Sequence, residues 1–337
     1  MNLTSQYISN PKVKKAYSNS NATYQSIQSS YSKIRLNENR EMLRPNRSRQ
    51  VSFNVSGITF KMIVCLRGMF TMGGHYEDED EDEYEYEYEY EYEYEYEDED
   101  EDCHKGLVSI EKTFLLGETE VTQELFEKVM GFNPSRFHGD EYPNPNSKKR
   151  PVECVTWYDA VMFCNKLSVR CKKKPYYNIS NIVHKTRRTF GIEEELPNIG
   201  QANVTINPQA NGFRLPFEKE WEYAAKAGTS NQWAGTNDEK KVGEIAWFKH
   251  NSQINKEQQT HPVRCKRPNE WGFYDMTGNV DEWCGDEHHE GSSVHRGFRG
   301  GSWFDKASLL HSTDREYCSP DSYYSTLGFR ISASLFQ

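Results

Sequence analysis

One short segment of the sequence combines residue types that bind a hard metal ion. Residues 275–283 are Asp-Met-Thr-Gly-Asn-Val-Asp-Glu-Trp, so Asp275 and Glu282 can supply carboxylate oxygens. A turn at Gly278 can direct backbone carbonyls toward the same point, and calcium prefers this mixture of oxygen ligands. The segment therefore predicts a structural calcium site. The alternative interpretation is a tight turn that holds no ion.

The sequence lacks the common signatures of covalent and nucleotide chemistry. It contains no nucleophile elbow, P-loop or Gly-x-Gly-x-x-Gly fingerprint, and only His288 and His289 are adjacent among its scattered histidines. None of the eight cysteines forms a Cys-x-x-Cys pair, which argues against zinc-ribbon and thioredoxin sites. Because residues 1–50 contain no apolar region typical of a secretory signal, we expect reduced thiols and a cytoplasmic location.

A second segment, residues 304–326, has the composition of a binding surface. It mixes aromatic, charged and small residues without a helical or strand period. Tyrosine provides rigid contact area and serine provides adaptable hydrogen bonds, a combination found in antibody paratopes. The alternative is an ordinary loop. The candidate ligand-binding residues are Phe304, Asp305, His311, Asp314, Tyr317, Tyr323 and Tyr324.

Three short helices are expected to position these segments. Thr122 and Thr156 are suitable N-cap residues, because each precedes apolar residues at helical spacing. A third helix is predicted after Arg214 and should end at Gly228, a typical C-cap residue. Residues 172–211 are polar and irregular, and we interpret them as a long excursion.

Strands are expected on both sides of these helices. Residues 51–74 alternate in the manner of a hairpin, and residues 107–117 again have strand character. Beyond residue 228 the chain is dense in Gly, Asn, Asp and Trp, which indicates short strands and long structured loops. Helices in the middle and strands at both ends predict an α+β fold whose termini meet in one sheet.

The charge of the chain is concentrated in two segments. The formal net charge is −10, but 19 of the 51 acidic residues lie in residues 77–102, a tract of only Glu, Asp and Tyr. We interpret the tract as a solvated low-complexity insertion, since like charges repel and keep it extended. The alternative is a cation-binding or partner-binding arm. Residues 1–50 hold 9 basic and 2 acidic residues and predict a disordered basic tail.

Residues 51–337 are predicted to form one domain that contains the acidic insertion. Outside the insertion its charges nearly balance, which gives no electrostatic case for binding nucleic acid. The sequence has no run of 18 apolar residues, so no membrane span is expected.

Eight short motifs occur in order along residues 52–334. Each is weak evidence by itself, but their order together is specific to one protein family. The motifs are Phe70–Gly73, Glu120–Thr122, Asn133–Ser135, Pro151–Asn165, Arg214–Ala225, Gly272–Trp283, Arg299–Trp303 and Gly328–Arg330. The sequence resembles the formylglycine-generating-enzyme domain, also called the sulfatase-modifying-factor domain. This resemblance implies an α+β fold that is a large variant of the C-type lectin fold, with few short helices, short strands and much irregular loop.

Several motif residues also have a physical role of their own. Arg214 and Arg330 are expected to be buried cations, which require carboxylate partners such as Glu220 or Glu222. The tryptophans of the motifs are expected to lie in the core; they are Trp221, Trp283 and Trp303.

The resemblance implies two kinds of metal site. In the family, the calcium loop uses side chains at the positions of Asp275 and Glu282 and carbonyls at those of Gly278 and Val280. Oxidase members also hold copper(I) between two cysteine thiolates that follow the Gly-Gly-Ser motif, because soft thiolates suit copper(I).

The copper site does not match this sequence. The positions of the two cysteines are taken by Asp305 and Leu310, so we expect neither bound copper nor the oxidation of cysteine to formylglycine.

The expected function is therefore binding. We predict a domain without catalytic residues that binds a protein or small-molecule ligand through residues 304–326. One alternative is an oxygen-dependent oxidoreductase with altered metal ligation. A second is a variable binding protein diversified by a retroelement, because residues 304–326 also resemble the variable segment of such lectin-fold proteins.

Overall fold

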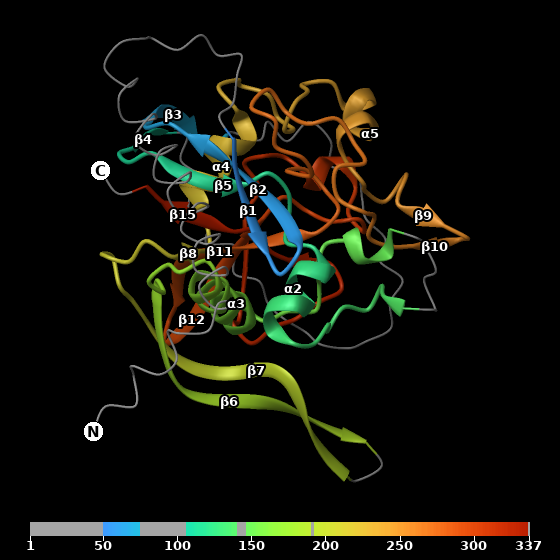
Figure 1. Ribbon diagram of the computed structural model, residues 1–337. Helices are drawn as coiled ribbons and strands as arrows, with labels where there is room; N and C mark the ends of the chain where they lie inside the picture. The colour runs from blue at the N-terminus through green and yellow to red at the C-terminus, as the bar shows by residue number, and fades with distance from the viewer. Residues whose placement is uncertain (1–49, 75–105, 140–145, 190–191, 336–337) are drawn as a thin grey trace, which may run out of the picture. The chain divides into compact units, whose positions relative to one another are not determined.

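A five-stranded sheet joins the two ends of the fold. The computed structural model describes residues 50–74, 106–139, 146–189 and 192–335. The first two strands form a hairpin around Ser56 and Gly57, which both have positive φ angles (Figure 1). The last strand lies between an inner strand and the edge strand of the same sheet, so the ends share one sheet as predicted. In spatial order the strands are β1 (Gln50–Val55), β2 (Ile58–Cys65), β5 (Phe114–Gly117), β15 (Ser332–Ser334) and β8 (Phe213–Arg214).

A four-stranded sheet carries part of the predicted binding segment. Three of its strands pair antiparallel, with a register shift between Trp283 and Glu287, and the fourth joins in parallel. Successive side chains of a strand point to opposite faces, so the residues of these strands contact different groups on the two faces of the sheet. In spatial order the strands are β13 (Glu316–Cys318), β12 (Ser293–Arg299), β11 (Asp281–Glu290) and β14 (Leu327–Gly328).

Strands β3 (Gly68–Met72) and β4 (Gly106–Ile110) flank the acidic tract in sequence. They pair antiparallel, and Met72 lies opposite Gly106. Residues 77–102 and the basic tail lie outside the described residues. A further small hairpin consists of β9 (Gln253–Ile254) and β10 (Glu257–Gln258).

The interpretation of residues 172–211 as an irregular excursion is wrong. They contain a long antiparallel hairpin of β6 (Tyr177–Thr189) and β7 (Ile192–Ile206), labelled at the bottom of Figure 1. The middle of β7 is anchored to a helix, because the Asp159 carboxylate accepts hydrogen bonds from the Asn198 side chain at 2.7 Å and the Ile199 N–H at 2.9 Å.

The predicted helices begin at the expected threonines. Helix α2 (Gln123–Met130) is capped by Thr122, and α3 (Trp157–Arg170) has Thr156 in a capping box with Asp159. Helix α4 (Glu218–Lys226) ends one residue earlier than predicted. Its C-cap is a left-handed Ala227, not Gly228. The remaining helical turns are α5 (Val242–Ile245), η3 (Ser147–Lys149), η4 (Glu239–Lys241) and η5 (Ala307–Leu309).

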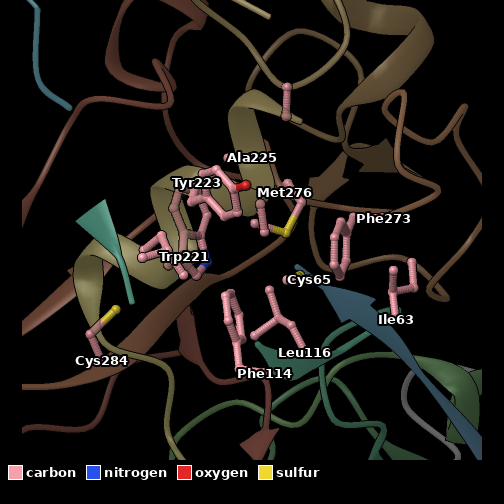
Figure 2. Packing of buried hydrophobic residues seen from close by; sticks show 13 residues of the cluster. Ile63, Cys65, Phe114, Leu116, Trp221, Tyr223, Ala225, Phe273, Met276 and Cys284 are labelled. Atoms are coloured by element: carbon pink, nitrogen blue, oxygen red, sulfur yellow. The ribbon is translucent and has the colours of Figure 1, made fainter. Parts of the chain in front are cut away.

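The main core lies between α4 and the five-stranded sheet. Figure 2 shows Trp221 of α4 close to Phe114 and Leu116 of β5, with Met276 nearby. The three motif tryptophans are buried, as predicted. Within the described residues, no helix is long and apolar enough to cross a membrane, and the seven cysteines there are free thiols.

Candidate functional site

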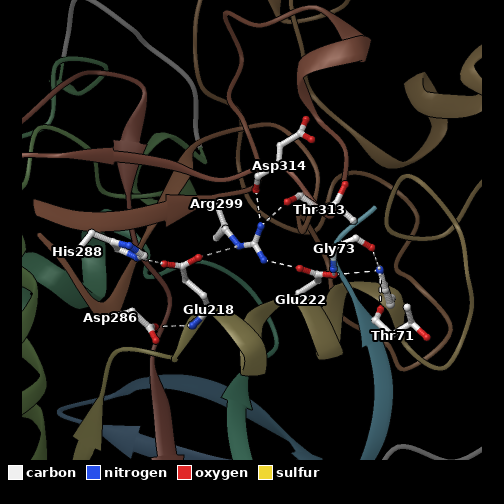
Figure 3. Close-up of polar contacts among 10 residues, drawn as sticks. Thr71, Gly73, Glu218, Glu222, Asp286, His288, Arg299, Thr313 and Asp314 are labelled. Carbon is white, nitrogen blue, oxygen red and sulfur yellow. Dashed lines mark hydrogen bonds and ion pairs between the residues drawn. The ribbon is translucent and has the colours of Figure 1, made fainter. Parts of the chain in front are cut away.

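A buried arginine anchors the predicted binding segment to helix α4. Arg299, at the end of β12, donates to the Glu222 carboxylate at 2.5 Å. Its other terminal nitrogen donates to the backbone carbonyls of Thr313 at 2.7 Å and Asp314 at 2.6 Å (Figure 3). Glu222 also accepts from the Gly73 N–H at 2.8 Å. One charged pair therefore fixes both the segment and the end of β3.

A second carboxylate of α4 contacts a histidine that packs against Tyr317. Glu218 lies 2.7 Å from His288 Nε2, and the His288 ring lies 3.7 Å from the Tyr317 ring between centroids. Asp286 accepts from the Glu218 N–H at 2.6 Å. Burial and the neighbouring Glu218 carboxylate raise the pKa of Asp286 to about 6. Tyr317 is thus packed on the α4 side of the four-stranded sheet.

Acidic side chains gather on the other face of that sheet. Burial and the nearby Asp305 and Glu316 raise the pKa of Asp281 well above its usual value. Glu316 stands next to Tyr317 on β13, so the two side chains point to opposite faces. Burial raises the pKa of Glu316, and the nearby Asp305 carboxylate raises it further.

The two positions of the family's copper thiolates have other roles here. Asp305 accepts from the Ser302 N–H at 2.8 Å and from its hydroxyl at 2.6 Å. Leu310 is fully buried in a cluster with Trp233 and Ala307. A carboxylate that stabilises a turn and a buried isobutyl group do not fit copper(I), which selects soft thiolates.

The predicted calcium ligand Glu282 is occupied by protein groups. One of its oxygens accepts from the Trp221 indole at 2.8 Å, and both accept from the Arg330 guanidinium. Arg330 also donates to the carbonyls of Tyr274 at 3.2 Å and Asp275 at 3.1 Å. Arg330 thus pairs with Glu282 and not with Glu220 or Glu222, the partners that the sequence suggests. Arg214 pairs with Glu220 at 2.7 Å, as expected.

Calcium binding by this loop stays a prediction. Glu282 does not fit the role of a calcium ligand, because both its carboxylate oxygens accept hydrogen bonds from the Arg330 guanidinium. Asp275 is buried, one carboxylate oxygen accepts from the Arg264 N–H at 2.8 Å, and the other has no hydrogen-bond partner among the described residues. Burial raises the pKa of Asp275 to about 6. The Gly278 N–H donates to the Gly300 carbonyl, and the Val280 N–H donates to the Glu120 carboxylate. The described residues contain no group of three His, Cys, Asp or Glu side chains placed to hold a metal ion.

Three predicted binding residues present large exposed aromatic rings. Phe304 is 53% exposed, Tyr323 39% and Tyr324 52%. The ammonium of Lys249 lies 5.6 Å from the centroid of the Phe304 ring, and that of Lys185 lies 4.8 Å from the Tyr323 ring. Each lysine belongs to a part of the chain outside residues 304–326.

The structure does not gather all seven predicted binding residues into one cluster. His311 and Asp314 are hydrogen-bonded to each other, with the His311 N–H 2.9 Å from the Asp314 carboxylate. Asp305 lies among the acids beside β11 and β13, while Tyr317 lies on the opposite face of that sheet. The half-exposed rings of Phe304 and Tyr324 are the most accessible members.

Sequence reasoning missed the residues that hold the segment in place. Arg299 belongs to one of the motifs, but nothing in the sequence shows that its guanidinium reaches the carbonyls of Thr313 and Asp314. Lys185 carries no signal in the sequence, because residues 172–211 show no strand period that would place its side chain.

Comparisons with known proteins agree with this architecture. Residues 52–335 match the family described as the sulfatase-modifying factor enzyme 1-like domain. "Chaperone protein LppX" of Paenibacillus barcinonensis is 40% identical over 209 residues, which cover 56% of this chain and 69% of that protein.

Two further relatives carry formylglycine-generating-enzyme names. The formylglycine-generating enzyme of Streptomyces coelicolor is 33% identical over 144 residues, which cover 35% of this chain and 46% of that protein. The inactive C-alpha-formylglycine-generating enzyme 2 of Bos taurus is 35% identical over 134 residues, which cover 36% of this chain and 44% of that protein. The chain thus matches less than half the length of both.

The fold also matches solved structures. Treponema denticola variable protein 1 superimposes with a TM-score of 0.65 and 32% identity, covering 85% of this chain and 99% of that one. PvdO from Pseudomonas aeruginosa shares the fold, with a TM-score of 0.56 and 21% identity over 85% of this chain and 98% of that one. The fold is the predicted formylglycine-generating-enzyme variant of the C-type lectin fold, and the chain belongs to the family of sulfatase-modifying factor enzyme 1-like domains.

Proposed function

We propose that this domain binds a protein or small-molecule ligand through residues 304–326 and does not itself catalyse an oxidation. The observation that carries the proposal is the chemistry at Asp305 and Leu310. The first is a carboxylate that caps a turn, and the second is buried among apolar side chains. Without a thiolate at either position, the copper(I) chemistry of the family's oxidases lacks its ligands.

The exposed rings support binding as the alternative use of the fold. Phe304, Tyr323 and Tyr324 each expose more than a third of their surface, and exposed aromatic residues are common contact residues in binding sites. Arg299 anchors the middle of the segment at Thr313 and Asp314, and the Cys154 N–H donates to the Tyr324 carbonyl at 2.9 Å. The similarity to an inactive enzyme of the family is consistent with a member that does not catalyse.

The proposal is tested by binding of the purified full chain to protein and glycan arrays. We expect ligands whose signal falls at least tenfold with Phe304→Ser or Tyr324→Ser, since a well-placed aromatic contact contributes about 1.4 kcal/mol or more. Ile206→Ser is the matched control, because this β7 residue is 56% exposed and lies outside the segment. Ligands that bind the tyrosine and phenylalanine variants unchanged would contradict the proposal.

A second candidate is a binding protein whose segment 304–326 is diversified by a retroelement. The observation that favours it is the 32% identity with a protein named for its variability, whose whole length the match nearly covers. Sequencing of gene copies and their surroundings tests it. We expect differences concentrated in codons 304–326 and a nearby reverse-transcriptase gene; differences spread evenly over the domain would contradict it.

A further inference from the structure

The loop of residues 319–324 is tied to the rest of the domain through its backbone. The Trp157 N–H donates to the Pro320 carbonyl at 3.0 Å, and the Cys154 N–H donates to the Tyr324 carbonyl at 2.9 Å. These two bonds fix the path of the chain at both ends of the loop. They do not determine where the ring of Tyr323 points, because that depends on its side-chain torsions.

A lysine from the long hairpin contacts the side chains of this loop. Lys185 of β6 donates to the Asp321 carbonyl at 2.6 Å and to its carboxylate at 3.0 Å. The same ammonium lies 4.8 Å from the centroid of the Tyr323 ring, within range of a cation–π interaction. The lysine is 19% exposed, so water screens these contacts only in part.

The partner of Lys185 is itself held in place. The Ser319 hydroxyl donates to the other carboxylate oxygen of Asp321. Burial would raise the pKa of Asp321, but the hydrogen bonds from Ser319 and Lys185 outweigh it and lower the pKa. Asp321 therefore stays ionised at neutral pH, and its charge remains available to the ammonium.

The neighbouring strand leaves room for the lysine side chain. A Cβ at Gly200 of β7 would lie 3.0 Å from Cγ of Lys185, closer than side chains normally pack. A glycine at this position lets the aliphatic part of Lys185 lie across its partner strand.

From this geometry we propose that Lys185 is a positioning residue, which orients Tyr323 for contact with the ligand of residues 304–326. The inference rests on the proposed binding function and extends it to the β6–β7 hairpin. Tyr323 keeps 39% of its surface exposed while Lys185 holds it. A contact residue that is ordered before binding loses less side-chain entropy on binding, so the affinity is higher.

The first test measures the orientation of Tyr323 without any ligand. 3-Fluorotyrosine is placed at position 323 of the full chain, and its fluorine NMR signal is recorded. We expect a signal distinct from that of an exposed tyrosine, which moves toward the exposed value in Lys185→Met and is restored in Lys185→Arg. Arg187→Gln is the matched control, since it removes an exposed charge of the same strand that pairs with Glu194. An unchanged signal in Lys185→Met would overturn the inference.

The second test measures affinity. Peptides are selected by phage display on the wild-type chain, and those that lose binding to Tyr324→Ser are kept. We expect Lys185→Met to weaken their binding about fivefold, the effect of about 1 kcal/mol. Lys185→Arg should restore most of the affinity, which a merely structural loss would not do. Urea unfolding confirms that the variants are folded.

The outcomes separate the two proposals. If peptides that need Tyr324 bind Lys185→Met with unchanged affinity, the positioning role is refuted and the binding function stands. If no selected peptide depends on Tyr324, the proposed binding surface is contradicted, and the fluorine signal alone decides whether Lys185 orients Tyr323.

Discussion

Arg299 donates to Glu222 at 2.5 Å in a place where both side chains are shielded from water. The pair joins β12 to α4, and the arginine then reaches two carbonyls of the binding segment. A charged pair with this many hydrogen bonds compensates for the cost of burying its charges.

Removal of the arginine charge should therefore be severe. We expect Arg299→Met to lower the free energy of unfolding by about 2–3 kcal/mol, because the carbonyls of Thr313 and Asp314 lose their charged donor. Glu222 keeps a partner, since the Lys226 ammonium lies 3.0 Å from its carboxylate. Urea unfolding measures this loss. In Arg187→Gln, which breaks an exposed pair with Glu194, the loss should stay below about 1 kcal/mol. Equal losses in the two variants would show that the Arg299 pair does not anchor the segment.

The stability of the binding segment should depend on pH through Asp314. Its carboxylate accepts a hydrogen bond from the His311 N–H, and burial raises its pKa to about 7. The folded state therefore keeps this proton up to about pH 7, whereas the unfolded chain loses it near pH 4. Between these values the folded state binds more protons, so this group's contribution to stability falls as pH rises.

Asp314→Asn should remove that slope. The amide resembles the protonated acid, so we expect the variant to be more stable than the wild type at pH 8 by about 1–2 kcal/mol. At pH 4 the difference should nearly vanish. Urea unfolding at both values checks this, and Glu194→Gln serves as an exposed control. A variant that is less stable at pH 8 would contradict a raised pKa for Asp314.

Much of the fold follows from local signals in the sequence. Thr122 and Thr156 cap their helices because a threonine hydroxyl satisfies a free N–H at the first turn, whatever the tertiary context. The pair Arg214–Glu220 is also local, since the two residues lie close in sequence around the start of α4.

Other features depend on contacts that are distant in sequence. The β6–β7 hairpin has mostly polar, exposed side chains, so it lacks the alternation that marks a half-buried strand. The middle of β7 is held by Asp159, which is far from it in sequence. The opposite placement of Glu316 and Tyr317 requires knowledge that residues 316–318 form a strand, which three residues cannot signal. The pairing of Glu282 with Arg330 likewise becomes visible only in the folded chain.

The variant Asp275→Asn tests the predicted calcium site. Arg330 already supplies positive charge to Glu282, so we expect millimolar Ca²⁺ to change the melting temperature equally in the wild type and in Asp275→Asn. Any shared shift would reflect binding elsewhere, such as the acidic tract. A rise in melting temperature that is present in the wild type and absent in Asp275→Asn would show that the loop binds calcium, since a ligand bound only by the folded state stabilises it.

The acidic tract should be dispensable for folding. Met72 and Gly106 pair directly across the two strands that flank it in sequence, so a short turn can replace the residues between them. We expect excision of residues 77–102, with a Gly-Ser linker, to change the free energy of unfolding by about 1 kcal/mol or less, because loop-closure entropy varies only logarithmically with length. Hydrogen exchange and urea unfolding measure this. A loss of several kcal/mol would mean that the tract packs against the domain.

We propose that a domain with Asp305 and Leu310 at the thiolate positions binds a ligand but does not oxidise cysteine. The most direct measurement incubates the purified full chain with copper(I), oxygen and a peptide containing Cys-x-Pro-x-Arg, and follows the cysteine by mass spectrometry. We predict no aldehyde above the level of a metal-only control. Formylglycine formed over repeated turnovers by the wild-type chain would contradict the account.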